Sequence, residues 1–167
     1  IPTQTRFNMP VDRGYSQDDG WYSFDQGPIH FVMMNTEMSC DAGTRQIAWS
    51  ENDLSRVDRT ITPWVVFMGH RQMYSTYNPE PDQVCPDTLE PLLLKYKVDL
   101  ALWGHIHYAL LTCPVYQGKC VTERDRTGYD APVHAIIGNS GQVSVTSLTS
   151  THGRSSKPNM FAVCIAF

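Results

Sequence analysis

The chain has 167 residues and a formal net charge of −4 at pH 7, and 18% of its residues are charged. That length suits one domain with a sizeable core. Without a polybasic patch we expect no nucleic-acid partner, and no uninterrupted apolar segment is long enough to span a bilayer. The chain begins with Ile1 and shows no signal peptide, so we expect a processed chain or a fragment.

The first half of the chain predicts a β-hairpin followed by a helix. Residues 1–20 are expected to be irregular. Residues 21–24 and 29–34 have the composition of strands, with a turn between them. His30, inside the second strand, is expected to be a hydrogen-bonded structural residue rather than a ligand. Thr44 is suited to cap a helix that continues to about residue 58.

Two apolar segments then end in the same way, with glycine followed by histidine. The first ends at Gly69-His70 and the second, after a helix predicted over residues 88–97, at Gly104-His105-Ile106-His107. In layered α/β folds, ligands bind beyond the carboxyl ends of the strands. We therefore expect His70, His105 and His107 to converge as metal ligands, imidazole being the commonest one. The alternative is a loop with exposed histidines.

The remaining segments complete a layered pattern. Residues 110–116, 133–137 and 160–167 have the composition of strands, and residues 122–131 form a polar loop. His134 lies in mid-strand, which favours a core position or one behind the metal ligands. The alternation of strands and helices predicts an α/β fold built on a layered sheet.

Five cysteines are present, and two of them bracket a short loop. A disulfide between Cys113 and Cys120 would close this loop and would imply an oxidising compartment. Composition alone allows free, buried thiols equally well. We predict the disulfide.

Several motifs of this chain occur together, in the same order, in one known family. They lie in residues 21–25, 27–31, 57–60, 62–64, 69–74, 104–107 and 112–120. In these segments, which extend over nearly the whole chain, the sequence resembles the purple acid phosphatases of the metallophosphoesterase superfamily. The resemblance implies a four-layer α/β/β/α sandwich that holds two metal ions at strand ends and hydrolyses phosphate monoesters at acid pH.

The resemblance also implies a role for each histidine. The residue that matches His107 binds ferric iron, and those that match His70 and His105 bind a divalent zinc, manganese or iron ion. Arg71 or Tyr74 is a candidate contact to the phosphate-ester substrate. Members of this family are secreted or vacuolar glycoproteins, so the same location is expected here.

The chain departs from the family pattern in its other ligands. It lacks the aspartate of Gly-Asp-x-Gly, the aspartate and tyrosine of Gly-Asp-x-x-Tyr, and the asparagine of Gly-Asn-His-Glu or Gly-Asn-His-Asp. We therefore expect residues 1–167 to be the carboxyl-terminal part of a catalytic domain. An amino-terminal half of the same protein, or a companion chain, would complete it, and the isolated chain is expected to be inactive.

A second departure follows His107. The family's Asn-Tyr-Glu-Arg is replaced by Tyr108-Ala109-Leu110-Leu111, which removes polar groups beside the metals. This change leaves open a non-catalytic phosphatase-like domain that serves as a structural or binding module. A phosphodiesterase or nucleotide pyrophosphatase is a further alternative, because the same dinuclear centre serves both reactions.

Overall fold

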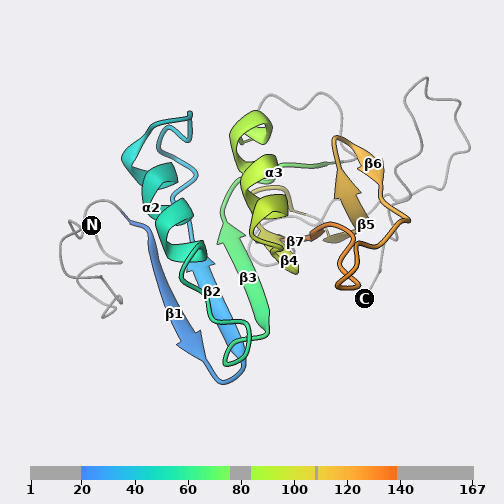
Figure 1. The fold of residues 1–167 in the computed structure, drawn as a ribbon. Helices are drawn as coiled ribbons and strands as arrows, with labels where there is room; N and C mark the ends of the chain where they lie inside the picture. The colour runs from blue at the N-terminus through green and yellow to red at the C-terminus, as the bar shows by residue number, and fades with distance from the viewer. Residues whose placement is uncertain (1–19, 76–83, 108, 139–167) are drawn as a thin grey trace, which may run out of the picture.

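The computed structural model describes residues 20–75, 84–107 and 109–138, which form a seven-stranded sheet and two helices (Figure 1). The strands lie in the order β1-β2-β3-β4-β7-β5-β6. In chain order the elements are β1 (Tyr22–Gln26), β2 (Ile29–Met33), α2 (Arg45–Leu54), β3 (Trp64–Gly69), α3 (Pro86–Lys95), β4 (Leu100–Trp103), β5 (Ala109–Tyr116), β6 (Lys119–Cys120) and β7 (Val133–Ile137). The expected α/β fold is confirmed.

Four neighbouring strands of the sheet run parallel, and this arrangement positions the candidate site. β2 pairs with β3, β3 with β4, and β4 with β7, each in parallel register. β1, β5 and β6 pair antiparallel with their neighbours. Because parallel strands point the same way, the segments that follow β2, β3, β4 and β7 all begin at one edge of the sheet.

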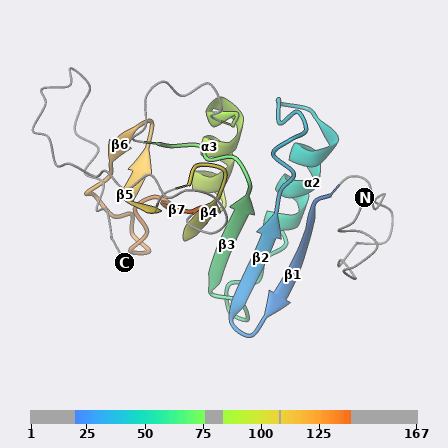
Figure 2. The same cartoon turned by 180° about the vertical axis from the view of Figure 1, so that it is seen from behind.

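Both helices cover the same face of the sheet (Figures 1 and 2). On this face Val32, Phe67, Ala101 and His134 lie in register on the four parallel strands and are buried. The opposite face is also apolar, since it carries the in-register residues Phe31, Val66, Leu100 and Val133. On this opposite face Trp64, the first residue of β3, is 56% exposed. A sheet that is apolar on both faces is typical of an inner layer of a sandwich.

The helices differ from their predicted limits. α2 ends at Leu54 rather than near residue 58, because the chain then turns and Val57 donates its N–H to the carbonyl of Leu54. α3 begins at Pro86, two residues earlier than predicted, since a proline at this position is already in helical geometry. Because of this earlier start, Pro91 lies inside the helix.

Two disulfides connect segments of the described chain. Cys113 bonds Cys120 across the β5–β6 hairpin, in agreement with the predicted pairing, and the turn has positive φ at Gln117 and Gly118. Such a pair of φ values belongs to a tight two-residue hairpin. Cys40 bonds Cys85, and this disulfide ties the segment after β2 to the start of α3.

Some predictions are not tested by the described residues. The irregular segment predicted over residues 1–20, apart from Gly20, and the closing strand over residues 160–167 lie outside them. The short strand β6 was not predicted, because two residues carry no periodic signal. Among the described helices, neither has the length and apolarity that a bilayer crossing requires.

Candidate metal centre

Two histidines lie at the edge where the parallel strands end. His70 follows β3 directly, and His105 follows β4 after Gly104. The Gly104 N–H donates to the His70 carbonyl at 2.9 Å, so the two strand ends are joined through their backbones. His105 has a φ of 62°, a left-handed conformation that is uncommon for residues other than glycine. Backbone outliers of this kind cluster at functional sites.

The two imidazoles face each other. His105 Nδ1 lies 3.2 Å from His70 Nε2, and the ring centroids are 5.0 Å apart with an interplanar angle of 77°. Two nitrogens that each bind one ion at about 2.0–2.1 Å, with tetrahedral angles, are about 3.3 Å apart. His70 is exposed and His105 partly so. The pair therefore has the separation and the access that two ligands of one metal ion need.

His107 lies beside the end of β7. A Cβ atom added to Gly138 would collide with the Ile106 carbonyl oxygen and would come within 3.5 Å of His107 Cα. Only glycine therefore lets the end of β7 pack against the His-x-His segment. The described residues contain no group of three or more histidine, cysteine, aspartate or glutamate side chains that could hold a metal ion. The role of His107 as a ligand stays a prediction.

The glycine before His70 has an equally specific reason. A Cβ at Gly69 would lie 2.7 Å from Thr36 Cγ2 and 2.8 Å from Trp103 Cζ3, which is closer than real Cβ contacts. The strand ends of β2, β3 and β4 therefore come together only because residue 69 has no side chain. Close packing therefore explains the glycine before His70, whereas a Cβ at Gly104 would make only ordinary contacts with His70, at 3.5 and 3.6 Å.

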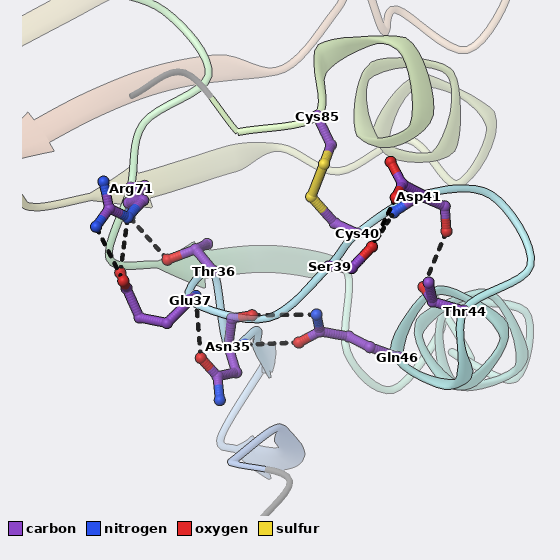
Figure 3. Close-up of a disulfide and its surroundings, with 10 residues drawn as sticks. All are labelled: Asn35, Thr36, Glu37, Ser39, Cys40, Asp41, Thr44, Gln46, Arg71 and Cys85. Atoms are coloured by element: carbon purple, nitrogen blue, oxygen red, sulfur yellow. Dashed lines mark hydrogen bonds and ion pairs between the residues drawn. A yellow bond between two sulfur atoms is a disulfide. The ribbon is translucent and has the colours of Figure 1, made fainter. Parts of the chain in front are cut away.

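The segment after β2 makes contacts with Arg71 that the sequence analysis did not predict (Figure 3). The Arg71 backbone N–H donates to Thr36 Oγ1 at 2.9 Å. The Arg71 side chain binds Glu37 through Nε and Nη2, both at 2.9 Å. The hydrogen bond from Arg71 lowers the pKa of Glu37, and the charges of Arg71, His70 and His105 add to this effect. The carboxylate thus belongs to the electrostatic surroundings of the histidine pair.

Tyr74 and His134 lie in the core beneath this edge. Tyr74 is 8% exposed, and its ring packs edge-on against His134 with centroids 4.9 Å apart. The indole N–H of Trp103 donates to His134 Nδ1 at 3.0 Å. Burial lowers the pKa of His134 to about 3, so the ring is neutral. His134 is a core residue, and the substrate contacts predicted for Arg71 or Tyr74 stay predictions.

His30 is a structural residue, as expected. Its Nδ1 lies 2.6 Å from Asp25 Oδ1, and its Nε2 lies 3.0 Å from Asp53 Oδ2 on α2. Burial acts to lower the pKa of His30, but hydrogen bonds to Asp53 and Asp25 together with their charges raise it above its usual value. Both ring nitrogens are occupied, so His30 joins β1, β2 and α2 and has no lone pair to offer a metal.

The chain is similar to known proteins over most of its length. The model of the calcineurin-like phosphoesterase family matches residues 4–109. The chain is 36% identical over 156 residues to "Probable inactive purple acid phosphatase 9" of Arabidopsis thaliana, a match that covers 86% of this chain and 23% of the relative. It is 33% identical over 144 residues to "Nucleotide pyrophosphatase/phosphodiesterase" of Hordeum vulgare, covering 82% and 38%.

A solved structure extends the likeness to the fold. A purple acid phosphatase from seeds of yellow lupin (Lupinus luteus) matches with a TM-score of 0.70 and 33% identity, covering 83% of this chain and 25% of that one. The described sheet and helices therefore have the metallophosphoesterase fold. The chain spans only about a quarter of the length of the first curated relatives it matches, 23% and 24%.

Proposed function

Because the chain belongs to the calcineurin-like phosphoesterase family, we propose that it takes part in metal-dependent hydrolysis of phosphate monoesters at acid pH. In this proposal His70 and His105 bind a divalent zinc, manganese or iron ion, and His107 binds a ferric ion. The similarity to purple acid phosphatases supports this proposal. The observation that carries the proposal is the 3.2 Å separation of His70 Nε2 and His105 Nδ1.

The chemistry of the donors explains what the histidines contribute. When bound, the metal ions would acidify water and neutralise charge on the phosphoryl oxygens. Neutral imidazole is the binding form, so protons compete with the metal at acid pH. The backbone hydrogen bond from the Gly104 N–H to the His70 carbonyl joins the two strand ends that carry the histidine rings. This restraint reduces the reorganisation that the two side chains need in order to bind a metal ion.

Histidine donors alone do not complete such a centre. They carry no charge, whereas two neighbouring cations repel each other and hard ferric iron prefers anionic oxygen ligands. We propose that these ligands come from an amino-terminal half of the same protein or from a companion chain. The partly exposed apolar face of the sheet supports this, because it would pack against that missing part.

The test is hydrolysis of p-nitrophenyl phosphate by the full-length protein with iron and zinc at acid pH. His70→Ala and His105→Ala should each reduce turnover by at least about a hundredfold, since each removes a side chain that binds the metal ion directly. Glu51→Gln, which removes an exposed carboxylate bonded to Lys95 on the helix face, should leave turnover unchanged. Full turnover in His105→Ala would contradict the proposal.

One alternative is a phosphatase-like domain without catalysis. Leu110 is buried and pairs with Ile136 on β7, so the segment after His107 places an apolar side chain in the sheet. The Arabidopsis relative carries the name "Probable inactive purple acid phosphatase 9". This alternative predicts that Zn²⁺ still binds at His70 and His105 while no phosphate ester is turned over above the metal-free blank.

A phosphodiesterase is the other alternative, and the name of the Hordeum vulgare relative, a nucleotide pyrophosphatase/phosphodiesterase, favours it. Bis(p-nitrophenyl) phosphate, a diester, distinguishes it from the monoesterase. A monoesterase should prefer p-nitrophenyl phosphate, and a diesterase should prefer the diester.

We also propose that the protein is secreted or vacuolar. The disulfides Cys40–Cys85 and Cys113–Cys120 support an oxidising compartment, where such bonds persist. Tagging the full-length protein and comparing the vacuole, culture medium and cytosol tests this location. A cytosolic protein with free thiols would contradict it.

A further inference from the structure

We propose that Thr36 and Glu37 are positioning residues for the histidine pair. They hold Arg71, and through Arg71 they fix the neighbouring His70 in the orientation in which it shares one metal ion with His105. This inference rests on the proposed function, because it assumes that His70 and His105 bind metal. It assigns a purpose to a segment that precedes β3 by almost thirty residues and contains no predicted ligand.

Arg71 is held at both its backbone and its side chain. Thr36 Oγ1 accepts the backbone N–H of Arg71, and this contact fixes the peptide group that links Arg71 to His70. Glu37 accepts two hydrogen bonds from the Arg71 guanidinium, so the side chain has one defined direction. A bidentate pair of this kind sets geometry more strictly than a single bond does. His70 therefore follows β3 directly before Arg71, whose backbone and side chain are both restrained by hydrogen bonds.

The restraint is effective because the segment carrying Thr36 and Glu37 is itself fixed (Figure 3). The buried side chain of Gln46 on α2 accepts the Asn35 N–H at 2.7 Å and donates to the Asn35 carbonyl at 3.1 Å. The Asn35 side chain accepts the Glu37 N–H at 3.1 Å. Farther along, the disulfide from Cys40 ties the same segment to α3. Thr36 and Glu37 thus connect α2, through Asn35, to Arg71 at the edge of the sheet where the parallel strands end.

The location of the Glu37–Arg71 ion pair distinguishes it from an ordinary surface ion pair. Glu51 and Lys95 also form an exposed pair, joined by one bond of 2.6 Å between α2 and α3. Exposed pairs contribute little to stability, so neither pair is expected to hold the fold together. Only the Glu37–Arg71 pair adjoins a predicted ligand. Glu51 is therefore a matched control, since its side chain is 48% exposed and that of Glu37 is 52% exposed.

The experiment is a calorimetric titration of the metal-free, full-length protein with Zn²⁺, together with the visible spectrum of the Co²⁺-loaded form. Glu37→Gln and Thr36→Val should weaken Zn²⁺ binding about tenfold, at the lower end of the loss seen when groups behind metal ligands are removed. Both should change the Co²⁺ bands, which report ligand geometry. Thr36→Ser, which keeps the accepting oxygen, and Glu51→Gln should behave like the wild type.

His105→Ala separates this inference from the function on which it rests. If His105→Ala abolishes Zn²⁺ binding at this site while Glu37→Gln and Thr36→Val match the wild type in affinity and spectrum, the positioning role is wrong and the metal site stands. If His105→Ala binds Zn²⁺ like the wild type, the proposed function fails, and the positioning role with it. Unchanged unfolding temperatures of the variants exclude loss of the fold as the cause.

Discussion

The histidines of this domain lie in two regions with opposite surroundings. In the interior, the two ring nitrogens of His30 contact Asp25 and Asp53, and His134 accepts the Trp103 indole N–H in the buried core. At the strand-end edge, His70 and His105 face each other 3.2 Å apart and are accessible to solvent. The difference in partners supports a structural role for His30 and His134 and the ligand role that we propose for His70 and His105.

The largest effect on stability is expected from the Cys40–Cys85 disulfide, which joins the segment after β2 to the start of α3. Its cysteines are 45 residues apart, so the chain-entropy model assigns it about 4 kcal/mol of unfolding free energy. Cys113 and Cys120 are 7 apart, which corresponds to about 2.4 kcal/mol. Urea unfolding of the two double alanine variants measures both values. Equal losses would show that loop length does not govern these bonds.

His134→Ala should destabilise the protein by about 3 kcal/mol, since it leaves a cavity and deprives the Trp103 N–H of its acceptor. Its Zn²⁺ affinity should remain that of the wild type, because the ring lies in the core. Urea unfolding and zinc titration of the same sample check both statements. A selective loss of zinc affinity at normal stability would move His134 into the metal site.

His30→Ala should cost about 2 kcal/mol, because two charge-assisted hydrogen bonds are lost, one of them to the partly exposed Asp25. The raised pKa of His30 means that the folded state binds its proton more tightly than the unfolded state does. The stabilisation is therefore complete below the unfolded pKa and is lost as pH rises through the folded pKa. Unfolding measured across this range should show a flatter pH dependence in the variant. An unchanged profile would contradict the assignment.

The smallest effect on stability is expected from the histidines at the edge where β3 and β4 end. Without metal, His70→Ala and His105→Ala should change the free energy of unfolding by no more than about 0.5 kcal/mol, as is usual for accessible side chains. Urea unfolding in the presence of a chelator measures this change. A loss as large as that of His30→Ala would place the pair among the structural histidines and remove the contrast between the two regions.

The sequence predicted the contrast only in part. The pairing of His70 with His105 was predictable because the glycine-histidine pattern ends two strands that are parallel neighbours. The Glu37–Arg71 pair joins residues 34 apart, and Glu37 lies outside the motifs, so no local signal indicated the pair. The sequence likewise contains no local signal for the pairing of Cys40 with Cys85, which lies 45 residues away. The early start of α3 has a local signal in Pro86, because proline favours the first turn of a helix.

The central claim, that His70 and His105 share one metal ion, is tested most directly by the stabilisation that Zn²⁺ confers. At free Zn²⁺ about a hundredfold above its Kd, binding should raise the unfolding free energy of the wild type by about 2.7 kcal/mol. His105→Ala, measured at the same Zn²⁺ concentration, should lose most of this gain and should keep its metal-free stability. An equal Zn²⁺-dependent gain in His105→Ala and the wild type would contradict the claim.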